Sequence, residues 1–319
     1  MILSPVLISA YSRPDHLKRC LESLQDCDFS ENTDVFITID APLTSDVRDL
    51  NKENHSVANM DWIFKSVNVI SQEKNTDGEI IKIEAKRLLK KYGKVIMMEE
   101  DNIFSIDFLR YMNWALNEYE STESILSVSG WSPDDESYSN LSSVYKYQGY
   151  CSWGAGLWES KSKDLIVSRE EHFNFFINKL SNISLSINYF SNVDHLIKGI
   201  YRYFLKNHEA GDRYINLKIF CEDSFSLYPG ISRVRNTGHD GSGINCKISE
   251  EHLSQRIASL SESFYIESSK DKNKRFFKRI YEHYRLSFLK RSFFVASFPF
   301  FYLFILWHKL RMIFKRMFK

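Results

Sequence analysis

The sequence lacks the signatures of several well-known nucleotide-binding and metal-binding proteins. None of its expected strands is followed by a G-x-G-x-x-G turn or a G-K-[ST] phosphate loop, which argues against dinucleotide-dependent hydride transfer and P-loop ATP hydrolysis. The five cysteines are an odd number with no C-x-x-C spacing, so neither a disulfide framework nor a zinc site is expected. They are Cys20, Cys27, Cys151, Cys221 and Cys246.

Export signals and membrane-spanning segments are not expected either. Residues 1–10 lack the basic segment and the long apolar core of a signal peptide, so we expect a cytoplasmic protein. Near the other end, Phe293–Trp307 is a 15-residue stretch without charge, whereas a spanning helix usually needs about 20 residues. Pro299 also interrupts this stretch.

Charge is distributed unevenly along the 319 residues. Residues 270–319 contain 14 Lys or Arg and two acidic residues, Asp271 and Glu282. The preceding residues contain 28 basic and 39 acidic side chains, so the body carries a net charge near −11 and the tail one near +12. A basic tail of this kind indicates contact with an anionic surface.

The first hundred residues alternate between apolar runs and helical patterns. Such βα alternation predicts an α/β fold with a parallel, doubly wound sheet. Ser12 and Pro14 mark the start of the first helix, as its cap and its first-turn proline. The second half is less regular. Strands are expected at 6–10, 34–39, 66–70 and 95–98, and helices are expected between them.

An acidic cluster, Glu99-Glu100-Asp101, directly follows the apolar run that ends at Met98. Open α/β sheets bind ligands at the carboxyl ends of their strands, where these side chains should emerge. Crowded carboxylates repel one another unless a cation neutralises them, and hard divalent ions prefer such oxygen ligands. The cluster therefore indicates a metal and diphosphate site. Alternatively, Asp101 or Ser105 caps the following helix.

Two further charged residues follow the ends of neighbouring strands. Arg13 lies where the first helix begins, and a helix N-terminus with an arginine binds anions well. Asp40 ends the second strand. Each has an ordinary alternative, since Arg13 is also suited to a surface ion pair and Asp40 to forming a turn. Their convergence with the acidic cluster in one crevice indicates a nucleotide diphosphate site.

The pattern resembles the GT-A glycosyltransferases, and within them the branch of N-acetylglucosaminyltransferase I and similar bacterial sugar transferases. The resemblance covers about residues 5–250, and it rests on the order and spacing of four motifs. The resemblance implies a Rossmann-like fold with a mostly parallel sheet flanked by helices. The motifs are 5–14 (PVLISAYSRP), 99–101 (EED) ahead of Asp107-Phe108, 152–158 (SWGAGLW) and 236–243 (NTGHDGSG).

The resemblance also implies how the donor is held. Asp40 would read the uracil of a UDP-sugar, Arg13 would meet its phosphates, and Asp101 would coordinate the Mn²⁺ or Mg²⁺ that bridges the diphosphate. The family usually has Asp at the middle of the acidic triplet, where this chain has Glu100. The longer side chain changes the surroundings of the metal. The other expected donor contacts are Ala10, Tyr11, Glu99 and Glu100.

Inverting transfer needs a carboxylate base that takes the proton of the acceptor hydroxyl. Relatives carry their base just before an aromatic residue, and Asp212 stands at family-like distance ahead of the glycine-rich loop. Arg213, which follows it, is atypical and would lower its basicity. Asp212 is equally suited to capping a helix after Gly211. Glu222 and Asp223 are rival bases.

The two glycine-containing motifs are expected to contact the sugars. In the first, the Trp153 indole would stack on a sugar face while the glycines let the backbone approach, although aromatic residues are more often core. In the second, the glycines suit a lid over the donor, and His239 would join the metal or a phosphate, or be structural. The expected sugar and acceptor contacts are Trp153, Gly154, Gly156, Gly238, His239 and Asp240.

The basic, aromatic tail is expected to form an amphipathic helix on the surface of an anionic membrane. Alternatives are a helix packed on the body, a homo-oligomer seam or, because basic and aromatic residues interleave, a nucleic-acid contact. We do not expect nucleic acid, because an exposed apolar run does not help phosphate contacts.

Together these observations predict a metal-dependent, inverting glycosyltransferase. It would move a sugar from a UDP-sugar to a glycan or lipid-linked acceptor at the inner face of the cell membrane. The expected division is a transferase domain over 1–265, with a nucleotide-binding half at 1–101 and an acceptor half at 102–265, and a tail at 266–319. A nucleotidyltransferase, a retaining transferase and a membrane-bound glycan-binding scaffold with a decayed site are the alternatives.

Overall fold

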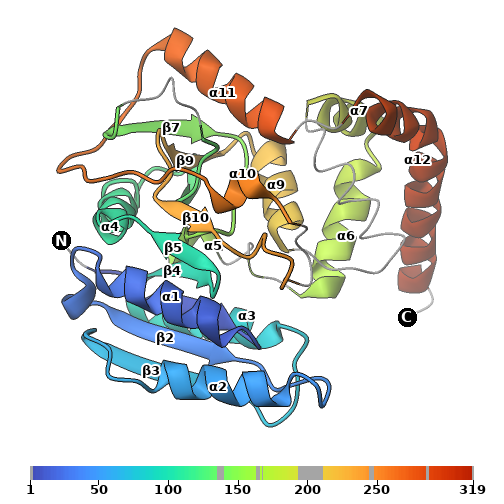
Figure 1. Cartoon of the computed structure of the whole chain (residues 1–319). Helices are drawn as coiled ribbons and strands as arrows, with labels where there is room; N and C mark the ends of the chain where they lie inside the picture. The colour runs from blue at the N-terminus through green and yellow to red at the C-terminus, as the bar shows by residue number, and fades with distance from the viewer. Residues whose placement is uncertain are drawn as a thin grey trace.

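The computed structural model describes residues 3–134, 140–162, 166, 168–192, 211–243, 248–284 and 287–317. A nine-stranded sheet runs through the molecule, and a two-stranded ribbon stands beside it (Figure 1). The ribbon consists of β5 (Asn102–Phe104) and β10 (Val234–Asn236). In spatial order the sheet strands are β11 (Tyr265–Ile266), β7 (Ser143–Tyr147), β9 (Phe225–Pro229), β6 (Ile125–Ser129), β8 (Ala155–Trp158), β4 (Lys94–Glu99), β1 (Val6–Ala10), β2 (Asp34–Ile39) and β3 (Ser66–Ser71).

Helices cover the sheet and form a separate group at one side. Figure 1 shows α6, α7 and α12 standing beside the sheet, with α6 packed against both of the others. The helices are α1 (Pro14–Gln25), α2 (Arg48–Ala58), α3 (Glu79–Tyr92), α4 (Phe108–Glu118), α5 (Glu159–Ser162), α6 (Arg169–Leu180), α7 (Ile183–Asn192), α9 (Gly211–Cys221), α10 (Glu250–Leu253), α11 (Lys270–Tyr284) and α12 (Phe288–Met317).

The predicted fold class is confirmed. All four expected strands form, and β3, β2, β1 and β4 pair in parallel as a βα alternation requires. Most of the remaining pairs are antiparallel and involve strands that follow residue 100, and β8 lies between β4 and β6. The first-turn proline is also confirmed, but the predicted cap is wrong. Arg13, not Ser12, is the N-cap residue of α1, and no side chain caps the helix.

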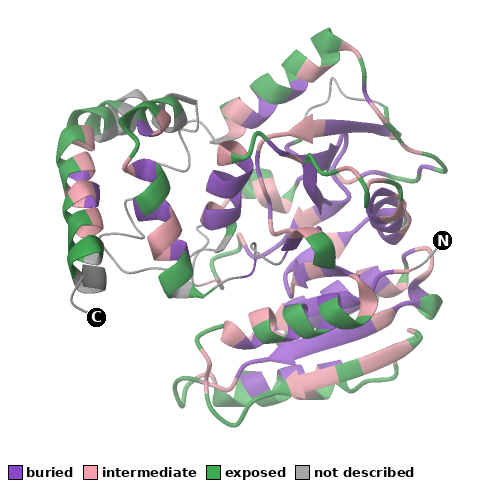
Figure 2. Ribbon diagram, turned by 180° about the vertical axis from the view of Figure 1, so that it is seen from behind, coloured by how far each residue is buried: buried purple, intermediate pink, exposed green. Residues whose placement is uncertain are grey.

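Two hydrophobic cores lie on the two faces of the sheet, and Figure 2 shows buried residues along its strands. Because side chains alternate along a strand, Val6 and Ile8 enter one core and Leu7 the other. The second core joins α6 and α9 to α12, whose Phe301 and Ile305 are buried in it. The proposed domain boundary at residue 265 stays a prediction, but α12 is packed on the body.

The β5–β10 ribbon brings distant segments together at the edge of the sheet. Its antiparallel register sets Asn236 opposite Asn102, just after the acidic cluster. The glycine-rich loop that begins at Gly238 therefore leaves the ribbon beside the carboxyl end of β4.

A fully buried ion pair fixes the other end of this ribbon. The Arg233 guanidinium lies 3.4 Å from the Asp107 carboxylate, and neither side chain is exposed. Asp107 also accepts hydrogen bonds from Ser105 Oγ and from the backbone N–H of Ser261. Burial lowers the pKa of Arg233, and Asp107 opposes this shift. The pair thus couples the start of α4 to the strand that carries the glycine-rich loop.

Removing the charge of Asp107 should destabilise the protein strongly, because it leaves a buried cation without its counter-ion. We expect Asp107→Asn to lower the free energy of unfolding by about 3 kcal/mol in urea titrations. The control is Asp49→Asn, since the Asp49 side chain is 88% exposed. Equal unfolding midpoints for the two variants would contradict this account.

Candidate active site at the carboxyl edge of the sheet

One guanidinium and two carboxylates form the centre of the candidate site. Arg13 Nε lies 2.7 Å from Glu100 Oε1, and Arg13 Nη2 lies 2.8 Å from Asp101 Oδ2. The two carboxylates are nearly inaccessible, while a fifth of the Arg13 side chain is exposed. Burial lowers the pKa of Arg13, but the two carboxylates raise it by more, so the guanidinium stays charged. The predicted convergence of Arg13 with the acidic cluster is therefore present.

Parallel pairing of β1 and β4 explains this geometry. The pairing sets Ser9 beside Glu99, so the chain segments that follow both strands leave the same edge. The backbone N–H of Glu100 donates to Ser9 O, and that of Tyr11 donates to Glu100 Oε2. Ala10 ends β1 and is buried. The register of β1 and β4 thus places Arg13 beside the two carboxylates. Its ion pairs are not those of an ordinary surface arginine.

Asp101 accepts hydrogen bonds from several neighbouring groups. Its Oδ1 accepts from the side-chain amides of Asn102 (3.1 Å) and Asn236 (2.9 Å), and its backbone carbonyl accepts from the Thr237 N–H. Gly238 passes so close that a Cβ there would lie 2.1 Å from Asp101 Oδ2. Neither of the alternative caps proposed for the next helix is used, because the N-cap residue of α4 is Asp107.

Glu99 and Asp212 complete the acidic edge. Burial, and then the charges of Asp101 and Asp212, raise the pKa of Glu99 to about 8. Asp212 is exposed in the first turn of α9. The Asn216 side chain ties this turn to the neighbouring loop, because it donates to Asp212 O and accepts from the Tyr150 N–H. The acidic edge therefore has more carboxylates than Arg13 neutralises.

The strand directions separate Asp212 from its rivals. β6 runs antiparallel to β8, which runs antiparallel to β4, so β6 and its parallel neighbour β9 point the same way as β4. The end of α9 that leads into β9 must then lie toward the opposite edge of the sheet. Glu222 and Asp223 follow that end, where they contact Lys218 and Gln148. Asp212 begins the helix near Glu99.

These residues fit a divalent cation whose coordination is completed by a bound ligand. Among the described residues, no three His, Cys, Asp or Glu side chains are close enough to hold a metal alone. Mg²⁺ is commonly bound by one or two carboxylates together with substrate phosphates and water, and Asp101 with its surplus of neighbouring carboxylates suits that arrangement. To bind a metal, Asp101 Oδ2 would have to give up its ion pair with Arg13. The guanidinium would then be able to bind an anion.

Asp40 lies at the predicted edge but is already hydrogen-bonded. Its carboxylate accepts from the backbone N–H groups of Ala41, Thr76 and Gly78 and from the Thr76 hydroxyl. It therefore orders the loop that leads into α3. Tyr11 holds the loop that follows β2, because its hydroxyl accepts a hydrogen bond from the Leu43 N–H.

The glycine-rich loop is held on two sides by histidines. His16 Nε2 lies 3.3 Å from Thr237 O and 3.2 Å from Asp240 Oδ2. Burial and the nearby Arg13 charge lower the pKa of His16. On the other side, the His239 ring stacks on His252 with centroids 4.0 Å apart.

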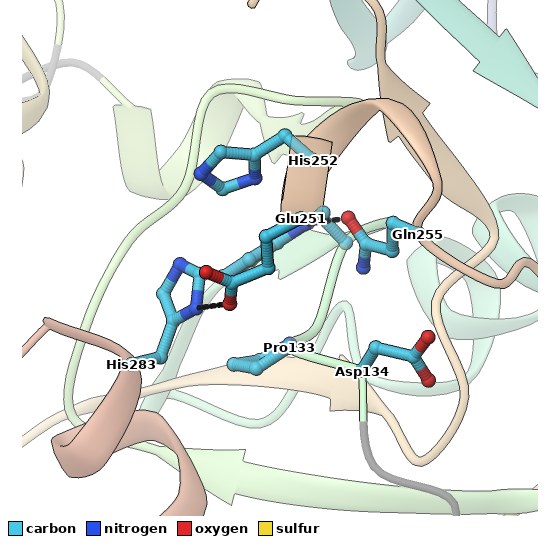
Figure 3. A pocket seen from close by; sticks show the side chains of 7 residues that line it. Pro133, Asp134, Glu251, His252, Gln255 and His283 are labelled. Atoms are coloured by element: carbon cyan, nitrogen blue, oxygen red, sulfur yellow. Dashed lines mark hydrogen bonds and ion pairs between the residues drawn. The ribbon is translucent and has the colours of Figure 1, made fainter. Parts of the chain in front are cut away.

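The His239 stack continues into an aromatic cluster. Trp153 contacts His239, His252 and Trp131 edge to face, so the structure places this indole in the cluster and half-buried. Figure 3 shows the pocket beside it, where His283 of α11 points to Glu251 of α10. The glycine-rich loop is thereby connected to the first helix of the basic tail.

Packing explains the two other glycines of the predicted site. Gly154 has a φ of +65°, and a Cβ there would lie 2.9 Å from the Phe108 ring. A Cβ on Gly156 would lie 3.0 Å from the Met112 methyl group. These glycines let α4 approach the sheet, and only Gly238 directly contacts the acidic cluster.

Sequence reasoning gives no role to three residues that organise the site. They are His16, Asn236 and Asn51, whose amide donates to the carbonyls of Tyr11 and Asp40. His16 and Asn51 were detectable as polar residues on the buried faces of α1 and α2. Asn236 had no such signal, because its role depends on the pairing of two three-residue strands.

Comparisons with known proteins give structural matches only. No protein-family model matches the chain, and neither does any curated protein. Similar solved structures include a mannosyltransferase from Pyrobaculum calidifontis in complex with GDP-Man and Mn²⁺, with 12% identity over 51% of this chain and 45% of that one and a TM-score of 0.34. This chain therefore spans less than half of that protein.

Two further similar structures are S. aureus TarS 1-349 and mouse xyloside xylosyltransferase 1. S. aureus TarS 1-349 shows 12% identity over 93% of this chain and 70% of that one, with a TM-score of 0.36. Mouse xyloside xylosyltransferase 1 shows 9% identity over 70% and 83%, with a TM-score of 0.37. At these TM-scores, no assignment of function rests on the superpositions.

The raised pKa of Glu99 predicts a pH dependence of stability. Between its ordinary value of 4.5 and about 8, the folded protein holds a proton that the unfolded chain has lost. This contribution to stability is therefore lost as the pH rises through about 8. We expect the difference in unfolding free energy between wild type and Glu99→Gln to change from pH 5 to 8, with wild type losing more. Parallel curves would contradict the assignment.

Proposed function

We propose that the chain is a metal-dependent glycosyltransferase that uses a UDP-sugar. The observation that carries this proposal is the convergence of Arg13, Glu100 and Asp101 with the glycine-rich loop at one edge of a parallel sheet. A surplus of carboxylates beside a cation and a glycine backbone suits a metal–diphosphate group. The four sequence motifs that resemble GT-A enzymes lend support.

In this proposal, Asp101 holds Mn²⁺ or Mg²⁺, with Glu99 and Glu100 beside it. When bound, such an ion neutralises the diphosphate leaving group. Arg13 takes the phosphate charge, and its contacts with Glu100 keep the guanidinium in place. Ala10, Tyr11 and Asp40 line the part of the site that takes the uracil. Asp40 reads the uracil and also orders the loop that follows β3.

Asp212 acts as the base of an inverting reaction. Its carboxylate takes the proton of the acceptor hydroxyl while that oxygen attacks the anomeric carbon and the bond to the diphosphate breaks. Its position at the start of α9, within electrostatic range of Glu99, supports this role. Gly238, His239 and Asp240 cover the donor and exclude water, and Trp153, which packs on His239, supports that cover, while Gly154 and Gly156 let the backbone approach the sugar.

The acceptor would be a glycan or a lipid-linked saccharide at the inner face of the cell membrane. The net positive charge of residues 270–319 favours a peripheral location on anionic lipid. Sugar identity depends on a few polar contacts around the glycine-rich loop.

Turnover tests this function directly. The purified protein, incubated with Mn²⁺, a panel of UDP-sugars and a saccharide acceptor, should release free UDP. We expect Asp212→Asn to lower kcat by about 10²- to 10⁴-fold with little change in KM, because it removes the base and leaves donor binding intact. The products should have inverted anomeric configuration.

Matched variants separate Asp212 from its rivals. Glu222 and Asp223 follow the other end of α9. The variants Glu222→Gln and Asp223→Asn should therefore keep wild-type turnover. Pyrophosphate in place of UDP would indicate a nucleotidyltransferase, and a retained anomeric configuration would exclude Asp212 as the base. Metal-independent glycan binding without any turnover would favour the scaffold.

A further inference from the structure

Helix α12 exposes a continuous apolar stripe on the surface of the described part of the chain. The stripe repeats with three- and four-residue spacing, so its members share one side of the helix. Each of its large side chains is between 54% and 76% exposed. The apolar stripe consists of Phe300, Leu303, Trp307, Leu310 and Phe314.

The opposite side of α12 is attached to the protein. Phe301 and Ile305 are buried against α6, and the Tyr302 hydroxyl and Lys309 Nζ both donate to Ser181 at 2.7 Å. In Figure 2, α12 stands at the margin of the molecule and buried and exposed residues alternate along it. The helix is therefore fixed in rotation, and its apolar stripe faces outward as a property of the fold.

We infer that the apolar stripe lies in the surface of an anionic membrane, with α12 parallel to the bilayer. Phe, Leu and Trp side chains flanked by cations are typical of helices that lie at the interface. Residues 288–317 include no Asp or Glu but contain six cations: Lys290, Arg291, Lys309, Arg311, Lys315 and Arg316. Anionic headgroups complement that charge.

The same charge distribution disfavours a second copy of the chain. Pairing two α12 helices would bring cations together without any acidic partner on either helix. Val295 and Ile313 are also exposed, at 65% and 46%, so the apolar surface is broader than the narrow seam of a coiled coil. Pro299 lies inside the helix, where it would interrupt such a seam.

The charge positions favour an in-plane orientation. No helix in the described ranges is long and apolar enough to cross a membrane. Beyond Trp307 the stripe continues as Leu310 and Phe314, with the exposed Arg311 beside it. The Arg311 guanidinium also lies 5.5 Å from the Trp307 ring centroid. A helix lying at the interface holds such cations at headgroup level while its apolar side chains enter the lipid.

This surface is connected to the candidate site through two helices. α6 packs on both α12 and α9, and α9 begins with the turn that contains Asp212. Membrane contact through the stripe would therefore fix how the carboxyl edge of the sheet is oriented toward the bilayer.

Vesicle sedimentation tests the inference. The full chain should sediment with vesicles of phosphatidylcholine and phosphatidylglycerol, and weakly with phosphatidylcholine alone. We expect the double variant Leu303→Glu and Trp307→Glu to lose binding by about tenfold or more, because it places charge in the apolar stripe. Ile63→Glu is the matched control, since Ile63 is 66% exposed and lies outside α12.

The remaining outcomes are separable. Wild-type sedimentation of the double variant would overturn the inference, as would a dimer in light scattering that the double variant dissociates. The melting temperature of each variant checks that it is folded. Because vesicle binding is measured without nucleotide or metal, its failure would leave the transferase proposal intact, and the absence of UDP release would leave the membrane surface intact.

Discussion

The candidate site depends on the imbalance between one guanidinium and the carboxylates around it. Arg13 neutralises part of the charge on Glu100 and Asp101, but Glu99 and Asp212 stand nearby, and burial together with that surplus raises the pKa of Glu99. Holding these groups together costs free energy in the protein alone, because burial disfavours unpaired charge. A bound metal and diphosphate would redistribute the charge, since each cation would then have phosphate or carboxylate oxygens. The imbalance thus favours ligand binding at the expense of stability.

Two pairs of strands produce this imbalance of charge. Parallel β1 and β4 bring Arg13 to the acidic cluster, and the β5–β10 ribbon brings Asn236 and the glycine-rich loop over it. The buried Asp107–Arg233 pair then anchors the ribbon from its far end. The floor of this site is set by strand pairing, and its cover is a glycine-containing loop. Such a division suits a reaction in which the donor binds first and the loop then excludes water.

Much of the first half follows from the sequence. Apolar runs of four to six residues alternating with amphipathic helices specify the parallel strands, and strand ends specify where Arg13 and the acidic cluster meet. The rest depends on contacts between distant segments. Neither three-residue strand of the ribbon has a signal of its own, and the stacking of His239 on His252 depends on a loop path. Composition indicates a basic, apolar tail but not that Phe301 and Ile305 would pack on α6, which fixes the face that α12 exposes.

The most direct test of the central claim is thermal unfolding with UDP-sugars, measured with Mn²⁺ and again with a chelator. The account predicts that at least one UDP-sugar raises the melting temperature only when the metal is present, because metal and diphosphate balance the surplus of carboxylates together. It also predicts that Asp101→Asn, which keeps the shape of the side chain, abolishes this increase. An equal increase in the presence of chelator, or no increase with any UDP-sugar, would contradict the assignment of the acidic edge as a metal–diphosphate site.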